Sequence, residues 1–240
     1  MTSTRSPRRS RQRTPRAAAP VDELIARLDR AYAQARLALD FDSPLHLLVA
    51  LILAAQCTDA KVNEITPALF RRFPSARDLA TASQEELETW IRSTGFFRQK
   101  ARAIRACCAE LVAHFDSRVP ADLDTLLSLP GVGRKTANIL RGNAFGIPGI
   151  GVDTHVGRLA QRLGLSTNQE PDRIEADLTA IIPLAQQIRF CHLLQQHGRQ
   201  VCSARKPSCH TCILADICPF PGKISQLRER KTPMSSRWVR

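Results

Sequence analysis

Apolar residues recur at helical spacing along most of the chain, and no segment shows the alternation of a half-buried strand. One helix is predicted to begin near Val21, where this spacing starts. A second follows Ser43-Pro44, which provide an N-cap and a first-turn proline. Residues 45–55 of this second helix are apolar on nearly all sides, so we expect it at the centre of a core. The pattern predicts an all-α fold.

Later segments continue the helical pattern. Ser83 and Glu86 form a capping box for a helix that Gly95 ends. A short helix is predicted near Leu123. The same spacing predicts helices at 100–115, 134–145, 153–163, 171–181 and 184–197.

Two glycines, Gly131 and Gly133, lie in the turn between two short predicted helices. They let the backbone turn tightly and expose N–H groups at the start of the next helix, which is a site for phosphate. Arg134 and Lys135 place cations beside it. An ordinary helical hairpin with glycine in its turn explains the same residues, so the glycines alone do not identify a function.

Four of the eight cysteines form a C-x6-C-x2-C-x5-C pattern, at Cys202, Cys209, Cys212 and Cys218. The other four are scattered, which argues against the disulfide framework of a small secreted protein. Zinc accepts the same ligands, usually from two short C-x2-C pairs. The uneven spacing favours a [4Fe–4S] cluster over zinc.

The formal net charge of +13 is concentrated at the two ends of the chain. Residues 1–16 hold six arginines and no acidic residue, and residues 223–240 hold six basic residues and one glutamate. The chain between them is nearly neutral. We expect a disordered basic tail at 1–19 and a basic C-terminal tail at 223–240. A polyanion is the partner suggested, although such tails bind any negative surface.

The longest apolar run is far shorter than the roughly 18 residues of a membrane span. No secretory apolar segment follows Met1. We therefore expect a soluble protein without a membrane partner, located in the cytoplasm with the nucleoid. The Arg-rich N-terminus also resembles an organellar transit peptide, and that alternative stays open.

The segment Leu-Pro-Gly-Val-Gly-Arg-Lys-Thr-Ala at 129–137 is followed by Val-Asp-Thr-His at 152–155. With Gln-Cys-Thr-Asp at 56–59 and the cysteine cluster, these segments resemble the endonuclease III family of helix-hairpin-helix DNA glycosylases. The resemblance covers about 21–221. It implies a six-helix barrel domain at 37–147 that carries the hairpin. It also implies an iron–sulfur cluster domain made of 20–36 and 148–222, with the active-site cleft between the two.

The resemblance implies a base-excision-repair DNA glycosylase with AP lyase activity that removes oxidised pyrimidines. Lys135 would attack the sugar of a flipped nucleotide, form a Schiff base and allow cleavage of the strand by β-elimination. Asp153 would stabilise positive charge on the sugar or activate the amine. The simpler alternative for Lys135 is a lysine that binds phosphate and takes no part in the chemistry. For Asp153 it is a helix N-cap, and Asp153 can serve as a cap and in catalysis. His155 is expected to support the site without being catalytic.

Further residues are assigned to DNA by the same resemblance. Gln56 would enter the duplex opposite the flipped base, and Phe96 would wedge into the stack where the family usually has leucine. A core aromatic is the alternative for Phe96. The hairpin residues Gly131, Gly133 and Arg134 would contact DNA, as would Arg205 and Lys206 of the cysteine loop, whose alternative is a solvated loop. The four cysteines would bind the cluster.

Two residues depart from the family pattern, and four further cations lie close to one of them in the sequence. Ala54 stands where the family often has serine, and together with Phe96 it puts the lesion preference in doubt. Arg98, Lys100, Arg102 and Arg105 are further candidates for phosphate contacts, although helical geometry cannot point all four at DNA.

Two rival functions share part of this sequence pattern. A mismatch adenine glycosylase shares the hairpin, the aspartate and the cluster, but it lacks the lysine and carries a large extra C-terminal domain. A non-catalytic iron–sulfur DNA-binding protein would use the cluster and hairpin alone. The pairing of Lys135 with Asp153 favours the enzyme. The expected partner is double-stranded DNA with damaged pyrimidines or abasic sites, bound by a monomer.

Overall fold

The computed structural model describes residues 18–222, and every regular element in that range is a helix. The predicted all-α fold is confirmed. In chain order the helices are α1 (Val21–Ala31), α2 (Pro44–Leu53), α3 (Asp59–Arg72), α4 (Ala76–Thr81), α5 (Gln84–Ile91), η1 (Arg92–Thr94), α6 (Phe97–His114), α7 (Leu123–Ser128), α8 (Arg134–Phe145), α9 (Thr154–Arg162), α10 (Pro171–Ile181), η2 (Leu184–Gln186) and α11 (Gln187–Gln200).

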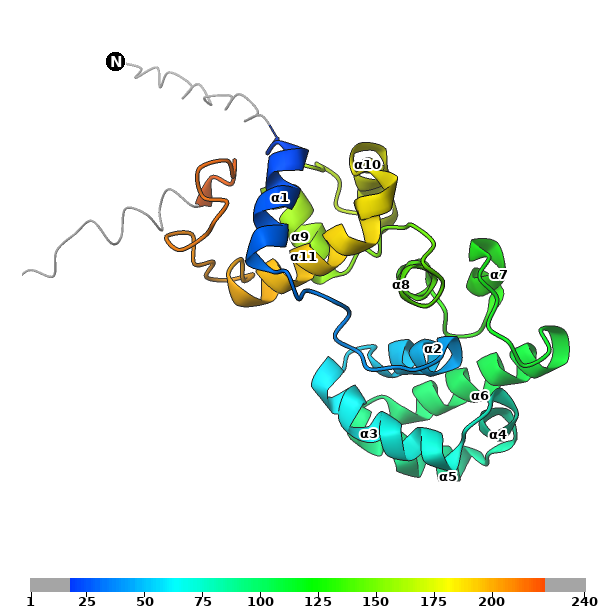
Figure 1. The fold of residues 1–240 in the computed structure, drawn as a ribbon. Coiled ribbons are helices and arrows are strands. Elements are labelled where there is room, and N and C mark those ends of the chain that lie inside the picture. The colour runs from blue at the N-terminus through cyan, green and yellow to red at the C-terminus, as the bar shows by residue number, and fades with distance from the viewer. Residues whose placement is uncertain (1–17, 223–240) are drawn as a thin grey trace, which may run out of the picture.

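The described residues bury their apolar side chains in two separate cores. One core gathers residues of α2 to α8 around α2, whose residues from Leu47 to Leu53 are all buried. The other gathers α1, α9, α10 and α11, together with the segment before α9. Figure 1 shows the same division, with α2 to α6 in one half of the molecule and α1, α9, α10 and α11 in the other. The all-apolar helix predicted from 45–55 is therefore the centre of the first core.

Some local predictions need correction. No helix was predicted over 59–81, where α3 and α4 form. The reciprocal capping box lies at Ser75 and Asp78, at the start of α4. At α5, Ser83 accepts from the Glu86 N–H at 3.0 Å, but the Glu86 carboxylate pairs with Arg72 instead of returning to the cap. Half of the predicted box is therefore present, because a nearby cation competes for the glutamate.

The N-terminal tail is shorter than expected. Ala19 is buried in the second core, and its N–H donates to the Leu163 carbonyl at 3.0 Å, so the disordered segment predicted for 1–19 does not reach it. The rest of that tail, and the tail predicted at 223–240, lie outside the described residues. Within the described range, no helix has the length and apolar character needed to cross a membrane.

Candidate active site

A cleft of about 670 Å³ opens between the two halves of the molecule. It is lined by residues near 37–39 and 57–63, by the start of α8, by the turn into α9 and by α11. Such a volume is typical of ligand sites. Lys135 on α8 and Asp153 before α9 line this same cleft. The fold therefore brings together the two residues that the sequence analysis assigned to catalysis.

Lys135 is the second residue of α8, and its side chain is exposed. The first N–H groups of a helix have no partner within the helix. Gly133, the N-cap of α8, has no side chain to accept from them. These donors and the positive end of the helix dipole therefore lie beside Lys135, and they favour the binding of an anion such as a phosphate.

The two hairpin glycines serve different purposes. Gly131 has a φ of 80°, and a Cβ added there would lie 2.9 Å from the Ala103 Cβ, so both its backbone angle and its packing against α6 require glycine. A Cβ on Gly133 would meet nothing within 4 Å. Gly131 thus fixes the turn, while Gly133 leaves open space in front of the N-terminus of α8.

Asp153 is the N-cap of α9, and its carboxylate accepts from two backbone N–H groups, those of His155 at 2.8 Å and Val156 at 2.7 Å. Both bonds end on Oδ1, so the capping role does not engage Oδ2. Asp153 therefore caps the helix and can still present an oxygen to the cleft. Burial lowers the pKa of the neighbouring His155, an effect that the Asp153 charge opposes.

An ion pair joins the two halves of the molecule at the cleft. Arg199 on α11 donates to the Asp59 carboxylate at the start of α3, with a distance of 2.6 Å. Both residues line the cleft. Its two members are 140 residues apart, so no local pattern in the sequence joins them or predicts the pair.

Gln56 and Phe96 share an unusual backbone conformation. Their φ angles are 52° and 48°, in the left-handed region that residues other than glycine rarely occupy. Gln56 is exposed, and Phe96 is 57% exposed. The core-aromatic alternative for Phe96 is therefore wrong. Backbone strain held at two exposed residues is typical of functional positions.

Lys100 does not lie where a phosphate contact would need it. Its side chain is buried, with 4% exposed, and its Nζ donates to the carbonyls of Leu53 and Thr94 at 2.8 Å each. The expectation that Lys100 contacts phosphate is wrong, because α6 begins at Phe97 and turns this side chain into the first core.

Arg134 is exposed beside Lys135 but already has a partner. Its Nε and Nη2 donate to the Glu175 carboxylate of α10 at 2.8 and 3.0 Å. The hairpin is thereby tied to the second half of the molecule.

The four cysteines of the predicted cluster site line one cavity, together with Arg162, His197 and Phe220. The Arg162 guanidinium donates to the Cys202 Sγ at 3.1 Å, and the Leu214 N–H donates to the Cys212 Sγ at 3.4 Å. Donors aimed at sulfur suit thiolates that share the negative charge of an iron–sulfur cluster. The donor set therefore fits a cluster.

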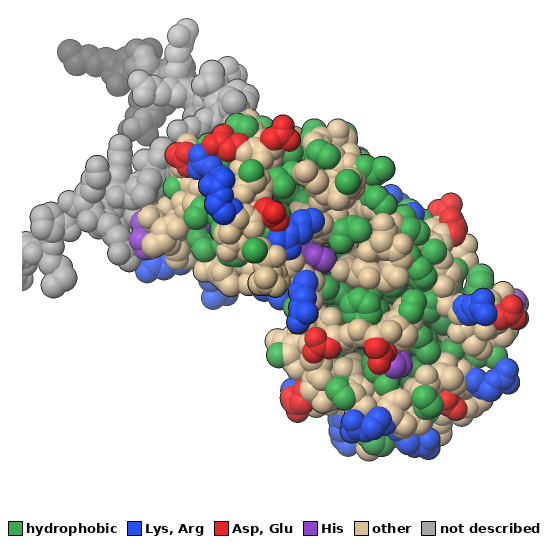
Figure 2. Space-filling view, viewed as in Figure 1, with side chains coloured by type: hydrophobic (Ala, Val, Ile, Leu, Met, Phe, Trp, Pro, Cys, Tyr) green, Lys and Arg blue, Asp and Glu red, His purple; other side chains and the backbone are tan. Residues whose placement is uncertain are grey.

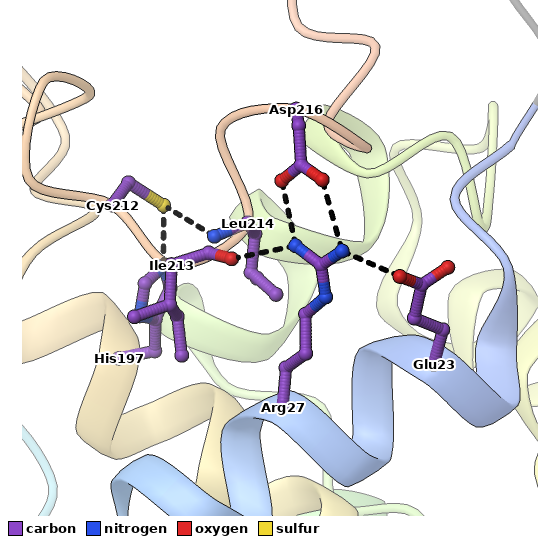
Figure 3. A network of polar contacts seen from close by, with 7 residues as sticks. All are labelled: Glu23, Arg27, His197, Cys212, Ile213, Leu214 and Asp216. Carbon is purple, nitrogen blue, oxygen red and sulfur yellow. Dashed lines mark hydrogen bonds and ion pairs between the residues drawn. The ribbon is translucent and has the colours of Figure 1, made fainter.

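Arg27 of α1 fixes the far end of the cysteine loop, as Figure 3 shows. Its guanidinium donates to both carboxylate oxygens of Asp216, at 2.6 and 2.9 Å, and to the Ile213 carbonyl at 3.0 Å. The Cys212 Sγ lies 3.4 Å from the His197 Nε2. A loop without regular structure is thus held by side chains from α1 and α11.

Arg205 and Lys206 are both exposed in the first part of this loop. Arg162 supports the backbone beside them, since it donates to the carbonyls of Ser203 at 2.8 Å and Ala204 at 2.7 Å. The two cations therefore project from a loop whose backbone is held in place. On the face shown in Figure 2, basic and acidic side chains are interspersed over both halves. Binding of an anion to that face therefore depends on cations at particular positions more than on net charge.

Two family models match the chain. Residues 49–184 match the HhH-GPD superfamily base excision DNA repair protein. Residues 202–218, from the first to the last cysteine of the cluster site, match the iron–sulfur binding domain of endonuclease III.

Relatives and solved structures agree with these models. Endonuclease III of Synechocystis sp. is 50% identical over 198 residues, which are 82% of this chain and 90% of the relative. The structure of a non-covalent endonuclease III–DNA complex matches with a TM-score of 0.82 and 38% identity, covering 87% of this chain and 97% of that one. A trapped endonuclease III–DNA covalent intermediate matches with the same values.

Proposed function

The chain belongs to the endonuclease III family of HhH-GPD base excision DNA repair proteins, and on that premise we propose that it removes oxidised pyrimidines through Lys135 and Asp153. It is a DNA glycosylase with AP lyase activity and holds a [4Fe–4S] cluster. The observation that carries the residue assignment is the shared cleft. Lys135 and Asp153 come from opposite halves of the molecule and line the same cleft.

The first step is binding to the duplex. The unpaired N–H groups at the start of α8 bind a phosphate, with Gly131 and Gly133 providing the turn and the space. Arg205 and Lys206 bind phosphates from the cysteine loop. Arg134 exchanges its bond to Glu175 for a phosphate or positions α8 through that bond.

The second step exposes the damaged nucleotide, because its glycosidic carbon is unreachable inside the stack. Gln56 enters the gap that the flipped base leaves, and the Phe96 ring wedges between neighbouring bases. The strained and exposed backbone at both residues supports this assignment.

The chemistry follows in the cleft. The unprotonated Lys135 Nζ attacks C1′, the glycosidic bond breaks, and the base leaves with the bonding electrons and gains a proton. The Asp153 carboxylate stabilises the positive charge that develops on the sugar. Ring opening gives the Schiff base, loss of a C2′ proton expels the 3′ phosphate, and water then releases the lysine.

The four cysteines hold the cluster, which when bound fixes the cysteine loop. The second domain, which we propose as 20–36 with 148–222, is supported by its separate core, as is the barrel domain at 37–147. We propose that a monomer is active, since every group of the reaction belongs to one chain. Size-exclusion chromatography of the protein on DNA tests this.

Borohydride trapping tests the mechanism, because it reduces the Schiff base to a stable link. Duplex DNA carrying thymine glycol or an abasic site should be trapped by the wild type. It should not be trapped by Lys135→Gln. An unchanged yield with Lys135→Gln would show that another amine reacts. A panel that includes 8-oxoguanine and A·G mispairs defines the lesion range and tests the adenine glycosylase alternative.

A further inference from the structure

Lys100 is a buried lysine to which the reaction above gives no role. Its ammonium makes two hydrogen bonds of 2.8 Å, to the carbonyls of Leu53 and Thr94. Burying a charge without partners is strongly unfavourable, so the surrounding carbonyls are what allow this side chain to remain inside the core. Burial lowers the pKa of Lys100, while the Cys57 thiol opposes that shift.

The two carbonyls belong to the two loops that carry the proposed inserting residues. Leu53 is the last residue of α2 and precedes Gln56 by three residues. Thr94 ends η1 and precedes Phe96 by two residues. These loops are 40 residues apart along the chain, and the Lys100 Nζ joins them directly.

Both loops end in strained backbone, with Gln56 and Phe96 in the left-handed region. Such a conformation persists only when its surroundings determine it. Leu53 and Thr94 are the last residues of their helices, so their carbonyls have no partner inside the helix. Each of these residues comes shortly before a strained residue. The ammonium therefore acts at the base of each loop.

We infer that Lys100 is a positioning residue for opening the duplex: its ammonium fixes the distance between the two loops, so that Gln56 and Phe96 enter the DNA together. This inference rests on the proposed insertion of these two side chains. Lys100 touches neither the sugar nor Lys135 in this role, so its loss should impair access to the lesion and leave the chemistry intact.

Substrates that do and do not require duplex opening separate the two effects. Lys100→Met keeps much of the side-chain volume and removes the donors. We expect excision of thymine glycol from duplex DNA to fall at least tenfold. Borohydride trapping on a single-stranded abasic oligonucleotide should stay within twofold of wild type, because nothing has to be unstacked. Arg77→Met removes an exposed cation of α4 and should match wild type on both substrates.

A double-mutant cycle with Phe96→Ala separates positioning from general stability. If Lys100 acts through the inserting residues, Lys100→Met should reduce duplex excision much less in the Phe96→Ala protein than in wild type. Unstacking by each variant is followed with 2-aminopurine placed beside the lesion. If Lys100→Met does not fold, Lys100→Gln takes its place. Its side chain is one bond shorter, so its amide cannot reach both carbonyls, and the same losses are expected.

Three outcomes would overturn the inference: wild-type excision from the duplex, equal losses on both substrates, or full additivity with Phe96→Ala. A wild-type protein that is trapped on neither substrate would instead overturn the proposed function. The two failures are therefore distinguishable.

Discussion

The first half of the molecule and the cysteine loop of the second half hold their functional residues by different means. On the side of the first core, Lys135 lies on the first turn of a helix, and Gln56 and Phe96 lie in tight turns next to helix ends. In the second half, residues 201–222, none of which lines the cleft, contain almost no regular structure. Arginine side chains and four thiols organise that segment instead.

The difference shows which part of the molecule should keep its structure when a single contact is lost. Backbone hydrogen bonds within helices keep most of the first half in place, and Lys100 adds a side-chain contact to Leu53, 47 residues away. The cysteine loop depends on Arg27 and Arg162, which reach from α1 and α9 to carbonyls, a carboxylate and a cysteine sulfur between 40 and 189 residues away. Removing one such contact or the cluster should therefore loosen the cysteine loop and spare the first half of the molecule.

Removing the cluster should affect the largest part of the molecule, the whole cysteine loop. When iron is chelated, residues 202–218 lose the four bonds that gather them, and Arg205 and Lys206 lose their positions. DNA affinity should fall about tenfold, as the loss of two phosphate contacts implies. Hydrogen exchange should rise across the cysteine loop while α2 and α6 keep their protection. Equal loss of protection in both cores would show that the two sides are not independent.

Arg162→Met tests the same side with the cluster retained. The guanidinium donates to the Cys202 Sγ and to the Ser203 and Ala204 carbonyls, and it covers the Phe220 ring. Losing donors to partly buried acceptors should reduce the free energy of unfolding by about 2 kcal/mol.

The matched control for this variant is Arg173→Met, which removes an exposed ion pair with Glu170. It should change the unfolding free energy by less than about 0.5 kcal/mol. Urea denaturation measures both variants. If they were equal, the contacts of Arg162 would not hold the loop.

The hairpin glycines test the first side, where backbone conformation dominates. Gly131→Ala forces a Cβ into the left-handed region and against Ala103, and should cost about 2 kcal/mol of stability. Gly133→Ala meets open space and should cost about 0.5 kcal/mol. Its methyl group should nevertheless weaken DNA binding, because it stands before the N–H groups of α8. Thermal melts with binding titrations distinguish strain from obstruction, and unchanged binding by Gly133→Ala would contradict the phosphate role.

The same contrast explains what could be predicted from the sequence. The all-α fold, the hairpin glycines and the cysteine spacing depend on local periodicity or fixed spacing, so the sequence shows them directly. The burial of Lys100 and the pairs of Arg199 with Asp59 and Arg134 with Glu175 depend on which helices meet in space. The roles of Lys135 and Asp153 came from resemblance, since a phosphate-binding lysine and an N-cap fit the local pattern equally well.

The smallest effect is expected for the Arg199–Asp59 pair, which crosses the cleft and joins its two sides. Both side chains are partly exposed, at 41% and 27%, so their coupling should be about 0.5–1 kcal/mol. A double-mutant cycle with Arg199→Met and Asp59→Asn measures it. The coupling should shrink in 1 M salt, where exposed charges are screened over about 3 Å. A coupling that salt leaves unchanged would mean that a buried contact joins the halves. The two halves of the molecule would then depend on each other more than the comparison of their contacts predicts.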